Sequence, residues 1–137
     1  MKLELTDRQF RLLLDMAYIG NWVLNSTRGE DRIVEYDDVE SRLFFECVRN
    51  GMDSLAEFRD GTVQPSRAFA SGGIHEAIMD YEDAVFYDIL AEELARRDLG
   101  LEDHEPEDYT ELTARMDEYL DEFDRSGLSA IHMELGE

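Results

Sequence analysis

The chain has little cysteine and no long hydrophobic run. Its single cysteine, Cys47, cannot form an internal disulfide or a thiolate metal site by itself. Cys47 shares a helical spacing with Leu43 and Phe44, which predicts a buried structural thiol. The most apolar stretch, residues 12–24, is too short to cross a membrane and contains Asp15. The first ten residues are polar and do not resemble a secretion signal, so we expect a cytosolic protein.

Motifs for catalysis are also missing from the sequence. There is no Gly-x-Ser-x-Gly, no His-Glu-x-x-His and no phosphate-binding Gly-rich loop. Neither the Glu-x-x-His pattern of di-metal helical bundles nor the spaced aspartates of a calcium loop occurs. The three histidines lie in separate segments. The sequence therefore favours a protein that is not an enzyme and needs no cofactor.

Basic residues are scarce, and this is the strongest anomaly of the composition. The chain has 34 acidic and 13 basic residues, which gives a net charge of −21. Residues 76–137 hold 21 acidic and 4 basic side chains, whereas residues 1–75 hold 13 and 9. Such a surface repels nucleic-acid phosphates and anionic lipids. We therefore expect neither direct nucleic-acid binding nor membrane binding.

Residues 6–25 are predicted to form the central helix. Thr6 and Gln9 have the spacing of a capping box, in which each side chain satisfies a backbone N–H of the other. Two adjacent apolar stripes cover most of this helix and predict burial on two or three sides. Gly20 costs up to about 1 kcal/mol in a helix interior, which is tolerable if another helix crosses closely there.

Four long helices and one short helix are expected in all. The others span residues 32–50, 73–97 and 107–125, with a short helix at 52–58. The alternative for the first of these is an extended lead-in followed by a helix from Asp37. Gly51 and Gly127 are placed to end two of the helices. With 137 residues the chain is large enough for a real core, and 43% hydrophobic residues argue against general disorder. The predicted fold is an all-α bundle around the first helix, with residues 1–137 as a single domain.

Two further segments have no helical pattern. Residues 1–5 and 131–135 both alternate apolar and polar residues, which is the period of a strand. They can pair into a ribbon, exchange between two chains, or remain as frayed ends. Residues 60–73 are rich in glycine and lack periodicity, so they are expected to form the longest loop.

The first candidate site is the narrow strip that the apolar stripes leave on the central helix. Arg11 and Asp15 are spaced for an ion pair, and Tyr18 and Trp22 continue the same line. Tyr, Trp and Arg are enriched at the centres of protein interfaces. The strip therefore predicts a partner or homodimer surface, unless another segment of the same chain covers it.

The second candidate site is an acid on the third long helix. Glu82 lies within an apolar arc, and Glu93 and His75 share its line. A carboxylate in apolar surroundings must be paired, protonated or bound to a metal. This predicts a buried acid or ligand site, while the alternative is an ion pair with a neighbouring arginine.

The third candidate site is the start of that helix, Ser71, Gly72 and Gly73. Backbone N–H groups at a helix N-terminus can bind an anion. The alternative is an ordinary flexible connector. The acidic face of the last helix can likewise imitate the phosphate track of DNA, or simply be a solvated surface.

Together these features predict a non-catalytic cytosolic interaction or regulatory domain that binds a protein partner or forms a homodimer. One alternative is an acidic nucleic-acid mimic that inhibits a basic nucleic-acid-binding protein. Another is a helical bundle that binds a metal or a small ligand through Glu82.

Overall fold

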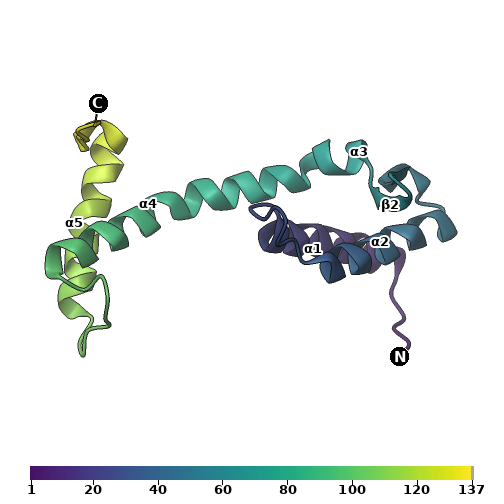
Figure 1. The fold of residues 1–137 in the computed structure, drawn as a ribbon, viewed down its shortest axis with the longest axis horizontal. Helices are drawn as coiled ribbons and strands as arrows, with labels where there is room; N and C mark the ends of the chain where they lie inside the picture. The colour runs from purple at the N-terminus through teal and green to yellow at the C-terminus, as the bar shows by residue number, and fades with distance from the viewer. Residues whose placement is uncertain (137) are drawn as a thin grey trace. The chain divides into compact units, whose positions relative to one another are not determined.

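The computed structural model describes residues 1–136 and is mostly helical, with one small antiparallel sheet (Figure 1). This confirms the helical class. The long helices are α1 (Asp7–Asn25), α2 (Val34–Arg49), α4 (His75–Leu99) and α5 (Thr110–Ser126). The shorter elements are η1 (Asp53–Leu55), β1 (Ala56–Arg59), β2 (Thr62–Pro65), α3 (Arg67–Phe69), η2 (Ala70–Ile74) and η3 (Gly127–Ala130).

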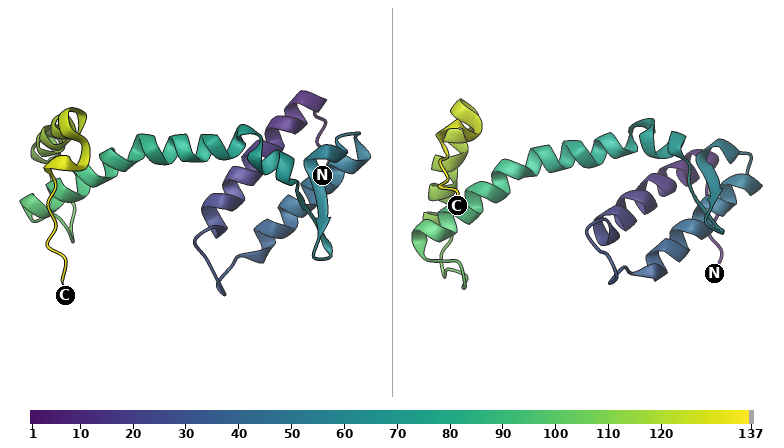
Figure 2. Two further views of the ribbon diagram at one scale, coloured as in Figure 1. Left: turned by 90° about the horizontal axis from the view of Figure 1, so that it is seen from above. Right: turned by 45° about the horizontal axis from the view of Figure 1, so that its top comes forward.

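The chain divides into two compact units, Met1–Met79 and Asp80–Glu137, with the boundary inside α4. In the first unit α1 and α2 lie side by side (Figure 2). The arrangement of all four long helices as one bundle around α1 stays a prediction.

The start of α1 confirms the predicted capping box. The Gln9 backbone N–H donates to the Thr6 hydroxyl at 3.1 Å, and the Thr6 backbone N–H donates to Gln9 Oε1 at 3.0 Å. Asp7 in the first turn complements the positive end of the helix dipole. This helix start is therefore specified by its own local sequence.

The core of the first unit lies between α1, α2 and α3. Its fully buried members are Leu14, Phe44 and Cys47, and Phe69 is nearly so. The rings of Phe44 and Phe69 meet edge to face with centroids 4.9 Å apart, a favourable geometry for aromatic pairs. Cys47 is buried as predicted, and burial raises the pKa of its thiol.

The expectation that α1 is buried on two or three sides is wrong. Leu12, Met16 and Val23 are 49%, 71% and 67% exposed. Their helical spacing places these apolar residues on one side of α1, but no element of the first unit packs against that side. The core covers only the opposite face of α1, through Leu14, Asn21 and Asn25.

Residues 56–65 form a β-hairpin where a short helix and a long loop were expected. β1 and β2 pair from Ala56 with Pro65 to Arg59 with Thr62. Asp60 and Gly61 form the two-residue turn, with φ of 53° and 82°. Positive φ at both positions is the hairpin turn that matches the twist of the strands. The hairpin lies beside α2 (Figure 2).

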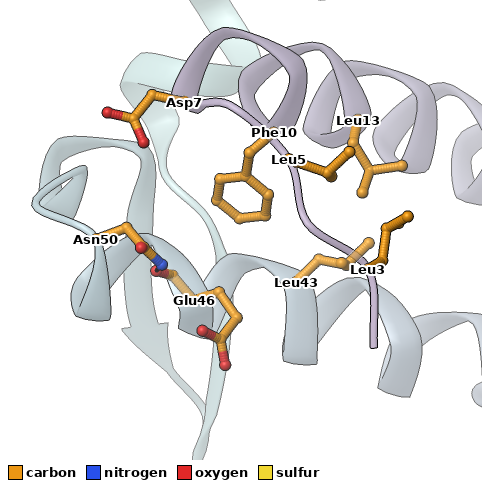
Figure 3. Close-up of a pocket in the computed structure, with 8 residues that line it drawn as sticks. All are labelled: Leu3, Leu5, Asp7, Phe10, Leu13, Leu43, Glu46 and Asn50. Atoms are coloured by element: carbon orange, nitrogen blue, oxygen red, sulfur yellow. Dashed lines mark hydrogen bonds between the residues drawn. The ribbon is translucent and has the colours of Figure 1, made fainter. Parts of the chain in front are cut away.

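Of the three outcomes expected for the termini, the described residues form no ribbon, because neither 1–6 nor 131–136 is a strand, and exchange between two chains stays a prediction. Leu3 and Leu5 instead line a hollow of about 340 Å³ together with Phe10, Leu13 and Leu43 (Figure 3). The N-terminal leucines therefore lie at the edge of a hollow between α1 and α2, and both remain exposed.

The second unit joins α4 to α5 through aromatic and ionic contacts. The rings of Tyr87 and Phe123 lie 5.1 Å apart. At the end of α4 the Asp98 carboxylate accepts hydrogen bonds from Tyr119, Arg115 and Arg97, and these donors hold its pKa well below the usual range. Gly127, with φ of 56°, ends α5 as predicted.

Candidate functional site

A cleft of about 330 Å³ lies between α1, the start of α2 and the hairpin. It adjoins a second hollow of about 440 Å³, and the two share Arg32, Glu40 and Gln64. These volumes fall in the range of ligand-binding sites. The cleft lining further includes Tyr18, Asn21, Trp22, Asn25, Ser26, Arg59, Pro65 and Ala70.

One wall of the cleft is aromatic. The Tyr18 and Trp22 rings are stacked with centroids 6.4 Å apart, one helical turn from each other on α1. Phe69 supports Tyr18 edge-on at 5.5 Å, and His75 supports Trp22 edge-on at 4.6 Å. The Tyr18 hydroxyl also lies 3.5 Å from His75 Nδ1. These contacts fix the orientation of both cleft-lining rings.

A polar network joins the cleft to the adjoining hollow, which Asp37 lines. The Asn21 amide donates to Asp37 Oδ1 at 2.9 Å. Arg32 donates to both oxygens of Asp37, at 2.6 and 2.7 Å. The Arg32 guanidinium, followed by the Asn21 amide, lowers the pKa of Asp37. Arg32 and Asp37 therefore neutralise each other in a bidentate pair.

Glu40 is the chemically unusual group of the cleft. Its side chain is half-buried, and it takes part in no ion pair among residues 1–136. Burial raises its pKa to about 7, the Asp37 carboxylate adds to the shift, and the Asn21 amide and Arg32 oppose it. Its carboxyl group is therefore poised between the neutral and ionised forms at neutral pH.

The other basic group of the lining is also paired. Arg59 lies 3.7 Å from Glu57 on the same strand and contacts the Pro65 carbonyl. Because Arg32 and Arg59 each have a carboxylate partner, the ionised Glu40 is the uncompensated charge of the lining. The arrangement can accept a hydrogen bond from a cationic group between a carboxylate and two aromatic rings.

The predicted strip on α1 is divided between this cleft and the core. Tyr18 and Trp22 line the cleft. Arg11 pairs with Asp15 at 2.5 Å, and its guanidinium lies over the Phe69 ring at 4.7 Å. Phe69 of α3 thus covers part of the strip within the same chain. The role of the strip as a partner surface stays a prediction.

The expected buried acid site is wrong. Glu82 and Glu93 are both exposed. The neighbouring apolar residues Phe86 and Ile89 are exposed as well, so they do not bury the two carboxylates. His75 contacts Tyr18 and Trp22 instead. Within residues 1–136 no three His, Cys, Asp or Glu side chains are grouped to hold a metal ion.

The segment Ser71, Gly72 and Gly73 does not precede a clean helix start. It lies in η2, a wide helical turn with a kink at the two glycines, where Gly73 has φ of 110°. The Ser71 hydroxyl donates to the Arg67 carbonyl at 2.7 Å, so it is engaged by the backbone. Anion binding here stays a prediction without a contact that supports it.

The helical spacing of Glu40 in the sequence indicates that its carboxyl group is partly buried. Glu40 lies four residues before Phe44 and seven before Cys47, so all three share one side of α2. The buried positions of that side are Phe44 and Cys47. A carboxylate in line with two core residues indicates a desolvated acid.

Among the helices of residues 1–136, none combines the length and apolarity that a membrane span requires. The chain matches no protein-family model, no curated protein and no solved structure, so its function has to be inferred from its own residues.

Proposed function

We propose that the protein is a non-catalytic interaction domain whose cleft binds a positively charged side chain of a partner protein. One observation carries the proposal: the Glu40 carboxylate has no ion-pair partner in residues 1–136 and lines the same cleft as Tyr18 and Trp22. An aromatic face attracts a cation by about 0.5–2 kcal/mol, and a carboxylate adds a charge-assisted hydrogen bond.

The charge of the chain supports a basic partner. A net charge of −21 attracts cations over the whole surface and raises the rate of encounter with a basic protein. Arg32 and Arg59 are both paired with carboxylates, which reduces their repulsion of an incoming cation. A lysine or arginine that enters the cleft would restore the charge balance of Glu40.

Binding is favoured over catalysis by the composition of the lining. General acid–base or nucleophilic chemistry needs a reactive group held by an orienting partner. The described lining offers one ionisable carboxyl, with Asn21, Asn25 and Gln64 as neutral amides and two paired arginines. Such a set suits recognition of charge and hydrogen-bonding groups.

The sole tryptophan makes the proposal directly testable, because Trp22 lines the cleft. We expect its fluorescence to change when a short lysine- and arginine-containing peptide is added at pH 8 and low salt. Glu40→Gln is expected to weaken this binding about tenfold or more, because it removes a charge-assisted hydrogen bond. A parallel titration with butylammonium separates a protein partner from a small amine.

Glu35→Gln is the matched control, since Glu35 is an exposed acid on the same helix outside the cleft. Glu35→Gln removes the same charge as Glu40→Gln. Because salt screens the attraction between residue 35 and a cation in the cleft, it should change the affinity by less than about twofold. If the two variants weaken peptide binding equally, the binding depends on the overall negative charge and not on the cleft. A fluorescence response that Glu40→Gln leaves unchanged would refute the proposal.

A second candidate function, the nucleic-acid mimic, is favoured by the pairing of the arginines in the second unit. Arg96, Arg97, Arg115 and Arg125 each form an ion pair with a carboxylate. The remaining acids of that unit are therefore uncompensated. This function predicts capture of DNA-binding proteins that 0.5 M salt abolishes and that Glu40→Gln leaves intact; salt-resistant capture, or none, would exclude it.

A further inference from the structure

The outer face of α1 carries an exposed apolar seam that the cleft does not use. Leu12, Met16, Ile19 and Val23 follow one another at intervals of four, three and four residues. This is the spacing with which two helices pack knobs into holes. Met16 and Val23 are about two-thirds exposed or more, Leu12 is half-exposed and Ile19 is half-buried. All four positions of the seam are therefore apolar, and no element of the first unit covers them.

Gly20, which lies beside the seam, is a second and independent observation. It lies inside α1, where glycine costs about 1 kcal/mol relative to alanine. A Cβ atom built on Gly20 would have nothing within 4 Å, so no contact of the chain requires the glycine. Glycine beside an apolar seam allows the backbone of another helix to approach closely.

We propose that this seam is a self-association surface, and that its occupant is α1 of a second copy of the chain in antiparallel orientation. Around a twofold axis near the middle of the seam, Leu12 would lie opposite the second copy's Val23. Met16 would lie opposite the second copy's Ile19. The surface is then complementary to itself, as a twofold interface requires.

The charges at the ends of α1 fit the antiparallel orientation. Arg8 is exposed next to the seam and takes part in no ion pair among residues 1–136. The last turn of α1 contains no basic residue, and its C-terminal end is capped by Arg28, which donates to the Leu24 carbonyl at 2.7 Å. The exposed Glu30 of the following turn takes part in no ion pair among residues 1–136. Antiparallel pairing brings the second copy's Arg8 to that end of α1. Residues 1–75 also carry the smaller charge excess, so pairing through α1 meets less repulsion than pairing through the acidic half.

Sedimentation of the full chain between about 10 and 500 µM at 0.15 M salt tests the seam. We expect a monomer–dimer equilibrium and at least a tenfold higher dissociation constant for Met16→Asp. Met133→Asp is the matched control, because Met133 is equally exposed but lies in the C-terminal segment. It should leave the dimer intact. Met16 does not touch the core, so its replacement should leave the chain folded.

Gly20→Ala gives a second readout that a monomer would not show. In a monomer it should stabilise α1, whereas in the dimer the added methyl group meets the second copy and weakens association several-fold. A strict monomer at 500 µM would overturn the proposal, including the case in which the second unit of the same chain covers the seam. A dimer insensitive to Met16→Asp and Gly20→Ala would overturn it as well.

Discussion

Replacing Asn25 by alanine is expected to lower the free energy of unfolding of the first unit by about 2–4 kcal/mol, because several buried groups lose their partners at once. The Asn25 side chain is buried at the end of α1. Its amide donates to Asn21 Oδ1 at 2.7 Å and to the Ile33 carbonyl at 3.0 Å, and its oxygen accepts the Ile33 N–H at 2.8 Å.

These bonds fix the geometry between the two helices of the cleft. Ile33 is the residue before α2, so Asn25 ties the last turn of one helix to the first of the next. It also orients Asn21, which lines the cleft and in turn contacts Asp37 of the adjoining hollow. Loss of Asn25 should therefore loosen the cleft as well as destabilise the fold.

Urea unfolding followed by Trp22 fluorescence measures this effect in the first unit. Asn50→Ala is the matched control, since Asn50 is exposed and its amide makes a single bond to the Glu46 carbonyl. We expect the control to cost less than about 1 kcal/mol. Equal losses for the two variants would show that the Asn25 network is not the source of stability.

Features set by local sequence were predictable. The capping box of Thr6 and Gln9 forms as expected, and Gly51 and Gly127 lie where α2 and α5 end. In each case the physical cause lies within four residues of the feature. Asn25 was not predictable in this way, because its partner Ile33 lies across a turn whose geometry no local pattern specifies.

The surroundings of the apolar faces were not predictable. The pattern of α1 gives which positions are apolar, but Met16 and Leu14 look alike in the sequence and only Leu14 is buried. Likewise the apolar arc around Glu82 suggested burial, and nothing in the second unit encloses it. Periodicity describes one element, whereas burial depends on which other elements pack against it.

The cleft depended on a hairpin that was missed. Arg59 and Gln64 reach the lining from β1 and β2. Asp60-Gly61 is a strong hairpin signal when it stands between short strand-forming runs. The glycine content and missing periodicity of residues 60–73 predict a loop instead. Without the hairpin, the sequence does not predict the cleft that Glu40 lines.

Glu40→Gln is expected to make the protein more stable than the wild type as the pH rises from 4.5 to 8. In the unfolded chain Glu40 ionises near its ordinary pKa of 4.5, whereas burial raises the pKa in the folded state to about 7. Between these values the folded state binds more protons than the unfolded state. The wild type therefore loses stability as the pH rises through this window, while glutamine cannot ionise.

The size of the effect follows from the shift and from the partial exposure of the group. The full shift corresponds to about 3 kcal/mol, and solvent screening of a half-buried carboxyl reduces this to about 1–2 kcal/mol. The facing groups Asp37, Arg32, Tyr18 and Arg59 are the same in both proteins. Their own titration therefore cancels to first order when the two proteins are compared at each pH.

Urea unfolding of both proteins at pH 4.5, 6, 7 and 8 measures the difference directly. We expect the stability advantage of Glu40→Gln to grow across the series and to level off above pH 7, whereas Glu35→Gln should give a nearly constant difference. A pH-independent difference for Glu40→Gln would mean that Glu40 is not desolvated. The same desolvation links stability to recognition: a cation that ionises Glu40 in the cleft would offset the cost that the empty cleft incurs above pH 7, so the pH range in which Glu40 destabilises the fold is also the range in which it should bind most strongly.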